Sequence, residues 1–350
     1  MNRRPFKEAK LVTARDVAEA IGVSISTIGR AMADDPRISE ATKVKVRKAA
    51  ERAGYVGNMP ARVMRGGTSS LVGLILPDVR NDFYSEIAQA LSETCDREGY
   101  RLVLSITNDD RDLEARHIRE LAGARVSGVI IVPSPQPRRE GIKMLQGMPH
   151  VQLLRHVSSL GDIWFGIDDE AGLREATQHL LKLGHRRIAY IGGPEALSTG
   201  AARVRGFRSA FELAGISRAQ ATELLGPTTV AHGFSAAAEI ARSSKAPTAI
   251  LTGSVHITLG VIQMVEDLNI SIPQQLSLIG FGDPIWFQWW RDGLTTIQLP
   301  IRELATTCGL WFLDNLRRKS ETTAHQHKAL TRSTLIERAT TASRSTRHST

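Results

Sequence analysis

The spacing of apolar residues changes along the chain and divides it into two parts. Between residues 13 and 54, apolar residues recur at intervals of three and four, as in short amphipathic helices. From Leu71 onward, continuous apolar runs alternate with segments of helical period. These patterns predict a small helical N-terminal part followed by a larger part in which strands and helices alternate.

Residues 13–54 predict three helices, the first two joined by a tight turn. Thr13 caps the first helix, and Asp16, three residues later, completes an acidic variant of the capping box. Gly22 supplies the left-handed residue that ends this helix, and Ser24 caps the second. A third helix begins at Ser39 and ends at the glycine at 54. So small a bundle has a tiny core and depends on its caps for stability.

The second helix is apolar on one side and mainly polar on the other. Ile28, Ala31 and Met32 form the inner face at spacings of three and four. A recognition helix places its N-terminal residues against the base edges of the DNA major groove. The remaining, outward positions are therefore the predicted base-reading face: Ile25, Ser26, Gly29 and Arg30.

The charge distribution favours DNA binding over an ordinary helical segment with a solvated face. Residues 1–70 hold 14 Lys and Arg against 7 Asp and Glu, whereas residues 71–340 hold 29 of each. The excess positive charge thus lies with the helix-turn-helix, where it would neutralise DNA phosphates.

The larger part has the alternating pattern of a doubly wound α/β fold, whose ligands bind at the carboxyl ends of the strands. Helices are expected at Tyr84–Arg97, Glu170–Leu183 and Ala201–Leu213. Buried parallel strands are expected in seven apolar runs: residues 71–77, 100–106, 128–133, 151–154, 187–193, 248–253 and 276–281.

The chain resembles the lac-repressor (LacI/GalR) family of bacterial transcription factors. The resemblance rests on T-A-R-D-V-A-E-A-I-G-V-S-I-S-T-I-G-R at 13–30, then I-S-E-A-T, G-Y-V-G-N and A-R-V-M-R-G-G-T, and it extends to about Thr340. It implies an N-terminal helix-turn-helix head and two doubly wound α/β subdomains of periplasmic-binding-protein type. The expected parts are a DNA-binding domain at 1–57, a hinge helix and linker at 58–70, an effector-binding and dimerisation core at 71–340, and a disordered tail at 341–350.

The same resemblance implies a homodimer that binds a pseudo-palindromic operator. Arg30 is expected to contact a guanine, Ser26 to make an adaptable polar contact, and Ile25 to contact a thymine methyl group. In the hinge, Met64 stands where the family usually has leucine, and we expect it to wedge into the minor groove. The alternative is a solvated linker with a stray methionine. Six further residues match family phosphate-contact positions: Ser24, Thr27, Arg37, Ser39, Tyr55 and Asn58.

Several residues match the family's effector site. Asn81, Phe83 and Tyr84 follow the first predicted strand, in a loop that lines this site in the family. The two aromatic residues are nearly as well explained as core residues that open a helix. Arg203 matches a family arginine that contacts effector oxygens, and Thr199 lies beside it. The alternative for Arg203 is a surface salt bridge.

The departures from the family pattern concern acidic positions. Gly282, beside Asp283, stands where the family commonly has aspartate, Arg155 replaces a second aspartate, and Ser254 with Val255 replaces an Asn-Asp pair. Because acidic acceptors are lost and a positive charge is gained, we expect an anionic effector, a sugar acid or a sugar phosphate, bound by Arg155 and Arg203. The G-F-G-D at 280–283 is similar to the gluconate-repressor branch.

The sequence leaves two interpretations of one aromatic cluster open. The cluster W-F-Q-W-W at 286–290 either forms a stacking wall for a ligand or packs between the subdomains.

The function is expected to be that of a transcriptional repressor of a carbohydrate or sugar-acid operon. The alternative is a small-molecule-binding protein or an enzyme with an accessory nucleic-acid-binding head. An architectural DNA binder would not need the neutral core.

Other chemistry is not indicated. The chain has no nucleophile elbow, no H-E-x-x-H and no P-loop lysine motif, so no catalytic residue or cofactor is expected. Its two cysteines, Cys95 and Cys308, fall in predicted helices and are expected to be free thiols rather than a disulfide or metal site. No signal peptide or membrane-spanning run is recognised, so a cytoplasmic protein without membrane contact is expected.

Overall fold

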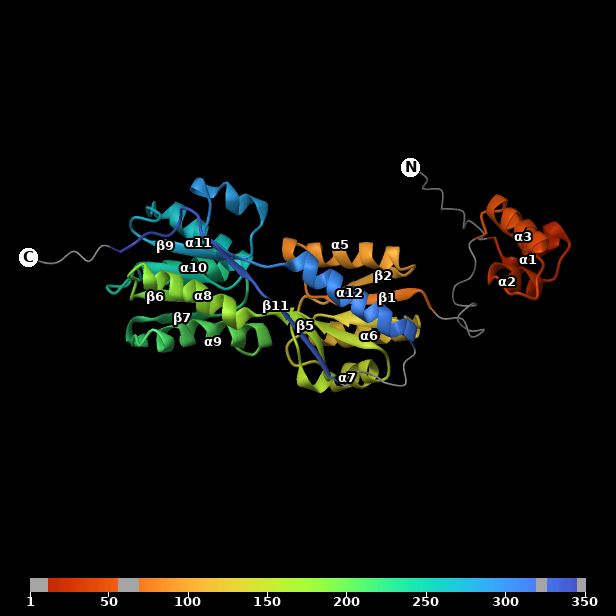
Figure 1. Ribbon diagram of the computed structural model, residues 1–350, viewed down its shortest axis with the longest axis horizontal. Coiled ribbons are helices and arrows are strands. Elements are labelled where there is room, and N and C mark those ends of the chain that lie inside the picture. The colour runs from red at the N-terminus through yellow and green to blue at the C-terminus, as the bar shows by residue number, and fades with distance from the viewer. Residues whose placement is uncertain (1–11, 56–68, 319–325, 345–350) are drawn as a thin grey trace, which may run out of the picture. The chain divides into compact units, whose positions relative to one another are not determined.

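The computed structural model describes residues 12–55, 69–318 and 326–344 and divides the chain into two compact units, residues 1–69 and 70–350 (Figure 1). The predicted phosphate contact Asn58, the wedge Met64 and the predicted hinge as far as residue 68 lie outside the described residues. Among the described residues, no helix combines the length and the apolar character needed to cross a membrane.

The first unit contains the three predicted helices, α1 (Ala14–Ile21), α2 (Ile25–Met32) and α3 (Glu40–Arg52). The predicted capping box is confirmed, because the Asp16 carboxylate accepts from the Thr13 backbone N–H at 2.7 Å. Gly22 ends α1 at a φ of 69°, a conformation that glycine adopts without steric cost. The small core consists of the buried side chains of Val17, Ala18, Ile28, Ala31, Val46 and Ala50.

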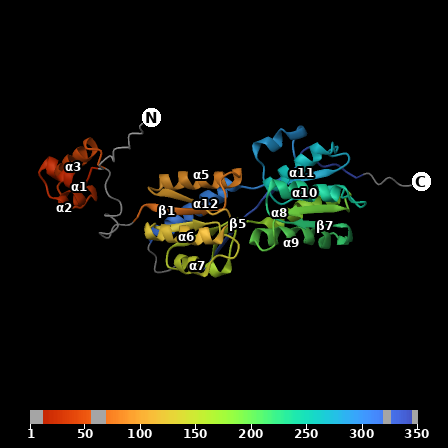
Figure 2. The ribbon, with the colours of Figure 1, turned by 180° about the vertical axis from the view of Figure 1, so that it is seen from behind.

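The second unit contains two six-stranded sheets with helices on both faces (Figures 1 and 2). We call the first sheet and its helices the N-terminal lobe. Its strand order is β11-β5-β4-β3-β1-β2, and all neighbours are parallel. The strands are β1 (Leu71–Leu76), β2 (Arg101–Ile106), β3 (Gly128–Ile131), β4 (His150–Leu153), β5 (Asp162–Ile167) and β11 (Gln326–Thr331).

Helices bury both faces of this sheet, as its continuous apolar strands require. One face packs against α5 (Asp82–Arg97) and α12 (Ile301–Arg318), and the other against α6 (Arg111–Gly123) and α7 (Arg139–Gln146). A short 3₁₀ turn, η1 (Ser158–Leu160), lies between β4 and β5.

The C-terminal lobe repeats this plan with strand order β12-β10-β9-β8-β6-β7, in which only the β10–β12 pairing is antiparallel. Its strands are β6 (Ile188–Gly192), β7 (Thr222–Leu225), β8 (Ala249–Thr252), β9 (Ser277–Phe281), β10 (Thr296–Gln298) and β12 (Thr334–Ile336). Its helices are α8 (Asp169–Lys182), α9 (Ser198–Leu213), α10 (Val230–Ala241) and α11 (Val255–Asp267), with 3₁₀ turns η2 (Arg218–Gln220), η3 (Ile285–Gln288) and η4 (Trp290–Asp292).

The chain crosses between the lobes three times: after β5, between β10 and α12, and between β11 and β12. Both sheets reverse their strand order next to the first strand of the lobe, so that β2-β1-β3 and β7-β6-β8 each contain a topological switch point. In open α/β sheets, ligands bind beyond the carboxyl ends of the strands at such points. The predicted doubly wound architecture is therefore present in both lobes.

The segment after β12 corrects one prediction. Residues 341–344 were expected to be disordered, yet the Ala342 N–H donates to Ser277 Oγ at 3.2 Å and the Arg344 N–H to the Leu183 carbonyl at 2.7 Å. Thr340, just before them, is buried and donates to the Leu278 carbonyl at 2.7 Å. Backbone hydrogen bonds to the C-terminal lobe hold this segment, although it contains few apolar residues.

Candidate functional sites

The outer face of α2 carries side chains that are available to a partner. The Ser24 hydroxyl accepts from the Thr27 N–H at 3.1 Å and so fixes the start of the helix. Ile25 is 44% exposed and does not belong to the core of the head. Arg30 is exposed and has no ion pair among the described residues. An exposed apolar side chain, hydroxyl groups and a guanidinium unpaired among the described residues therefore lie together on this face.

The predicted phosphate contacts of the head differ in how they are engaged. Arg37 forms a bidentate pair with Asp35, with Nη2–Oδ2 at 2.7 Å and Nε–Oδ1 at 3.0 Å. This guanidinium holds the pKa of Asp35 well below its usual range. Ser39 caps α3 through the Thr42 N–H. Tyr55 packs, half-buried, against the core of the head. A phosphate would therefore have to compete with Asp35 for Arg37.

A cavity of about 270 Å³ lies between the two lobes of the second unit. Its walls follow strand ends: Asp78 after β1, Asp109 after β2, Arg155 after β4, Thr228 after β7 and Ser254 after β8 all line it. Both lobes therefore present the carboxyl edges of their sheets to one cavity. Its volume is at the lower end of small-molecule sites, which favours a ligand of monosaccharide size.

Arg155 lies on the N-terminal-lobe wall and is bound on several sides. Its guanidinium pairs with the Asp109 carboxylate and donates to the Tyr84 hydroxyl and the Pro133 carbonyl, each at 3.4 Å. Burial raises the pKa of Tyr84, so the phenol stays protonated and can itself donate a hydrogen bond. Nearby, the buried Glu114 carboxylate accepts from the Ser134 N–H at 2.6 Å and hydroxyl at 2.9 Å.

Arg203 occupies the corresponding place on the C-terminal-lobe wall. Its Nε donates to Asp169 Oδ1 at 2.8 Å and its Nη1 to the Gly253 carbonyl at 2.8 Å. The guanidinium also lies over the Phe281 ring, 4.1 Å from the centroid. Burial raises the pKa of the Asp169 carboxyl, and Arg203 opposes this shift.

These contacts neutralise the positive charges that were expected to bind an anionic effector. That expectation rested on the loss of acidic acceptors, the gain of one positive charge, and the ability of Arg155 and Arg203 to bind oxyanions. Each is paired with an aspartate of the cavity wall, and Arg80, also on the wall, is paired with Asp78. The three arginines and three aspartates balance, so the cavity offers both donors and acceptors without net charge from these groups.

Seven of the eight predicted effector residues line this cavity: Asn81, Phe83, Tyr84, Arg155, Thr199, Arg203 and Ser254. Asn81 and Ser254 also cap α5 and α11, through the N–H groups of Phe83 and Ile257. The rings of Phe83 and Tyr84 pack edge to face at 5.1 Å. Their ligand contacts remain predictions.

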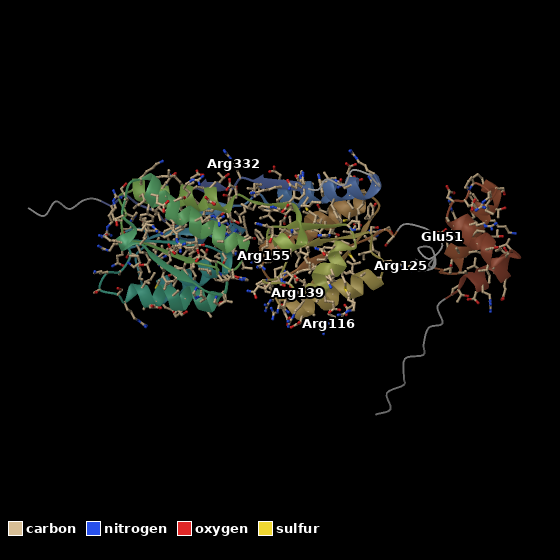
Figure 3. The ribbon with its side chains drawn as sticks, turned by 90° about the horizontal axis from the view of Figure 1, so that it is seen from below. Glu51, Arg116, Arg125, Arg139, Arg155 and Arg332 are labelled. Atoms are coloured by element: carbon tan, nitrogen blue, oxygen red, sulfur yellow. The ribbon has the colours of Figure 1, made fainter. Side chains whose placement is uncertain are left out.

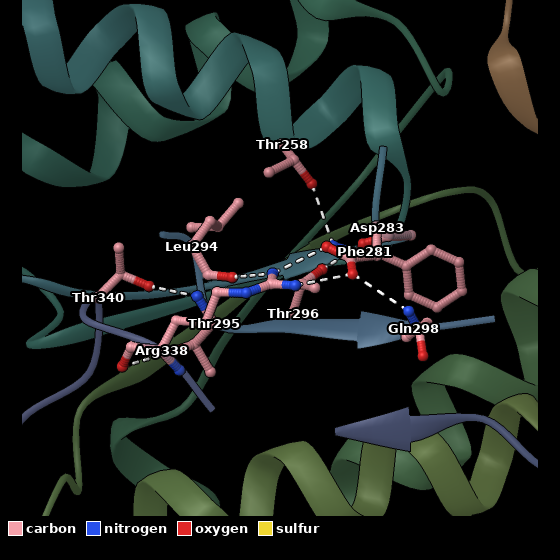
Figure 4. Close-up of polar contacts among 10 residues, drawn as sticks. Thr258, Phe281, Asp283, Leu294, Thr295, Thr296, Gln298, Arg338 and Thr340 are labelled. Carbon is pink, nitrogen blue, oxygen red and sulfur yellow. Dashed lines mark hydrogen bonds and ion pairs between the residues drawn. The ribbon is translucent and has the colours of Figure 1, made fainter. Parts of the chain in front are cut away.

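Asp283 is the exception and requires a correction, because it does not line the cavity. Its side chain is only 3% exposed and pairs with Arg338 through two contacts of 2.8 Å (Figure 4). Arg338 also donates to the Leu294 carbonyl at 2.8 Å, and Gln298 donates to Asp283 at 3.2 Å. Asp283 thus anchors the loop after β9 to the segment after β12.

The aromatic cluster at 286–290 fits neither alternative left open by the sequence. None of its members lines the cavity. Phe287 is fully buried within the C-terminal lobe and meets Trp286 edge to face at 4.3 Å. Trp290 donates to Glu266 of α11 at 2.9 Å, whereas Trp289 is 75% exposed. The cluster therefore packs η3 and η4 onto their own lobe.

Sequence reasoning missed the acidic partners of the two arginines. Asp109 lies three residues after an apolar run that was predicted as a strand, so its position beyond a strand end was a usable signal. Asp169 follows β5, which was not predicted, and no comparable signal was available. His256, Thr228 and Thr229 also line the cavity and also follow strands.

The described part of the chain offers few candidate residues for metal binding or for cysteine chemistry. No cluster of three or more histidine, cysteine, aspartate or glutamate side chains suited to a metal occurs among the described residues. Cys95 and Cys308 are buried, and burial raises the pKa of both thiols, that of Cys95 to about 11. Such thiols are poor nucleophiles at neutral pH.

Comparisons with known proteins agree with the two-part architecture. Residues 13–58 match the family of bacterial regulatory proteins called the lacI family, and residues 177–341 match a periplasmic binding protein-like domain. The chain is 30% identical to the HTH-type transcriptional regulator DegA of Bacillus subtilis over 83% of this chain and 88% of that protein. It is 29% identical to the ribose operon repressor of Escherichia coli over 84% and 90% of the two chains.

A solved structure supports the same assignment. The lac repressor dimer bound to operator and the anti-inducer ONPF is similar with a TM-score of 0.82 and 26% identity, over 95% of this chain and 100% of that one. Head and core together thus match one known architecture, and the similar proteins are described as regulators. The chain belongs to the lacI family of bacterial regulatory proteins and is a DNA-binding transcriptional regulator.

Proposed function

We propose that this protein is a homodimeric, cytoplasmic repressor of sugar-utilisation genes whose operator binding is controlled by a sugar in the cavity between the lobes. The observation that carries the proposal is the combination, in one chain, of an exposed outer face of α2 with a two-lobed cavity lined by Arg–Asp pairs. Two heads of a dimer would bind the half-sites of a pseudo-palindrome.

The balanced charges favour an uncharged, hydroxyl-rich effector over the anionic one expected from the sequence. Each sugar hydroxyl both donates and accepts, and each Arg–Asp pair offers a donor beside an acceptor. Phe281 and Phe83 add apolar surface for a ring face. A similar protein of the family, from Enterococcus faecium, is described with bound ribose, at 25% identity and a TM-score of 0.69.

Control of DNA binding would follow from the position of the cavity. Because the ligand contacts both lobes, it stabilises one lobe arrangement over another and shifts the equilibrium by its difference in affinity for the two. The predicted hinge ends at residue 70 and β1 begins at Leu71, so the N-terminal lobe is the part that would transmit the change to the heads.

Operator recognition is tested by selecting duplexes from a randomised pool with the full-length protein. Enrichment of one pseudo-palindromic sequence is expected. Recovery of unrelated sequences in proportion to the input would contradict sequence-specific regulation.

The effector class is tested by calorimetric titration of the full-length protein with neutral pentoses and hexoses, and with the matched aldonates and sugar phosphates. We expect a neutral sugar to bind, Arg203→Met to abolish its binding, and Arg205→Met to leave it unchanged, because Arg205 lies outside the cavity lining. Binding of aldonates or sugar phosphates alone, lost in the same variant, would refute the charge-balance argument and support the anionic effector.

A further inference from the structure

A second concave site lies on the N-terminal lobe, where α6 and α7 begin. It is a groove of about 590 Å³, lined by four arginines, Arg111, Arg119, Arg138 and Arg139, and by the acidic residues Asp112 and Glu140. None of these residues lines the effector cavity. We call this site the α6–α7 groove.

The positive charges of the groove exceed its negative charges. Arg138 binds Asp112 through two contacts of 2.6 and 2.8 Å, and Arg119 binds Glu140 at 2.5 Å. Arg111 and Arg139 have no carboxylate partner among the described residues. Both are exposed, so two guanidinium groups in a concave site remain available to an anion.

The start of α7 adds to this positive potential. The first turn of α7 lines the groove, and its N-cap residue, Arg138, forms no side-chain capping hydrogen bond. The first N–H groups of a helix lack intrahelical acceptors and carry the positive end of its dipole. Arginine forks and free backbone N–H groups are the donors that phosphate oxygens prefer in proteins.

We propose that the α6–α7 groove binds the phosphate group of a small phosphorylated metabolite. Two unpaired arginines match the charge of a phosphate monoester at neutral pH, and the volume is typical of sites for small ligands. The lining comes from the first turns of α6 and α7, from Arg119 further along α6 and from the loop that leads into α7, so the groove suits a single phosphate-bearing group rather than the row of phosphates along a duplex.

Two loops of the N-terminal lobe connect the effector cavity to the groove. In the loop after β2, Asp109 lines the cavity and pairs with Arg155, and α6 begins two residues later with Arg111, which lines the groove. In the loop after β3, the Pro133 carbonyl accepts from Arg155, and Arg138 at the end of the same loop lines the groove. Figure 3 labels Arg139 and Arg155 in this part of the N-terminal lobe. A phosphate in the groove would therefore brace both loops that position Arg155.

The test is calorimetric titration of the full-length protein with inorganic phosphate and with glycerol 3-phosphate, at constant ionic strength in a phosphate-free buffer. The double variant Arg111→Gln/Arg139→Gln should bind both ligands about tenfold or more weakly, because charge-assisted hydrogen bonds are lost. The matched control is Arg116→Gln, an exposed arginine of α6 that does not line the groove and is labelled in Figure 3. It should bind within about twofold of wild type.

Three results would overturn the proposal. Equal binding by the double variant and the wild type, or equal losses in the double variant and in Arg116→Gln, would show that phosphate responds only to diffuse surface charge. A larger loss for nonspecific duplex DNA than for glycerol 3-phosphate would assign the groove to nucleic acid instead. The titration with phosphate needs neither effector nor operator, so its outcome is independent of the proposed function.

Discussion

Two ion pairs between the same two helices allow a sharp test of how burial governs their strength. Asp169 and Arg203 connect α8 to α9 with side chains only 4% and 13% exposed. Glu170 and Arg205, the neighbouring pair, connect the same helices at 2.9 Å with side chains 39% and 58% exposed. We predict that Asp169→Asn destabilises the protein far more than Glu170→Gln.

The expected magnitudes follow from desolvation. Removing one partner of a buried pair leaves an uncompensated charge and costs about 3–5 kcal/mol. Arg203 keeps its hydrogen bond to the Gly253 carbonyl and its place over Phe281, so the lower end, about 3 kcal/mol, is expected. The exposed pair is screened by water, so Glu170→Gln should cost about 0.2–1 kcal/mol.

The measurement is equilibrium urea unfolding followed by both tryptophan fluorescence and circular dichroism. The two signals must give coincident transitions and the variants must share one m-value, because only then do the free energies compare directly. Equal losses in Asp169→Asn and Glu170→Gln, within about 0.5 kcal/mol, would refute the argument from burial.

Three further predictions concern other parts of the chain. Arg30→Ala should relax base preference at one operator position and cost about 1–3 kcal/mol there; an unchanged preference in a randomised-site selection would exclude a base contact. Thr340→Val should lower the free energy of unfolding in urea by about 1–3 kcal/mol, because the buried Thr295 N–H loses the Thr340 hydroxyl that accepts from it at 2.8 Å. An unchanged free energy would mean that water takes the place of this hydroxyl. Burial raises the pKa of Glu114 above its ordinary 4.5, against the opposing hydrogen bonds from Ser134. The folded state therefore holds this proton to higher pH than the unfolded chain, and the resulting stability is lost as pH rises through the raised pKa. The free energy of unfolding of wild type minus that of Glu114→Gln should thus fall from pH 4.5 upward, and a flat difference would contradict the assignment.

Strands that are apolar throughout could be predicted from the sequence. All seven predicted apolar runs contain a strand. Six of these strands are central in their sheets and buried on both faces, as in a doubly wound fold, whereas the seventh, β2, is a partly exposed edge strand. The head was predicted equally well, since its caps at Thr13, Ser24 and Ser39 are local hydrogen bonds between residues three apart.

The strands that were missed lack this local signal. β7 and β11 lie at the edges of their sheets, and β11 alternates exposed and half-buried residues. β10 and β12 span three residues each. β5 carries Asp162 and Trp164 and follows β4 through a 3₁₀ turn instead of a helix. These strands depend on tertiary pairing, which local periodicity does not report.

The site was predictable as a set of positions but not as an electrostatic arrangement. Residues after strand ends were expected near the ligand, and most do line the cavity. The partner of Arg155 lies 46 residues away in sequence, and that of Arg203 lies 34 residues away. Because no local pattern connects such residues, the sequence could not name the aspartates with which the two arginines form ion pairs.

The three crossings between the lobes limit how the protein can move. Two bodies joined by a single tether can rotate about any axis, whereas each further tether removes some of this freedom. Here β11 and β12 lie in different sheets with only residues 332 and 333 between them, so the third tether is almost taut. We therefore expect the lobes to have little freedom to separate, and the motion left to them to be rotation about an axis near the three connecting segments. A ligand then needs to supply only enough free energy to favour one position along that single rotation. A longer linker at 332–333 would allow the lobes further motions without changing any residue of the cavity.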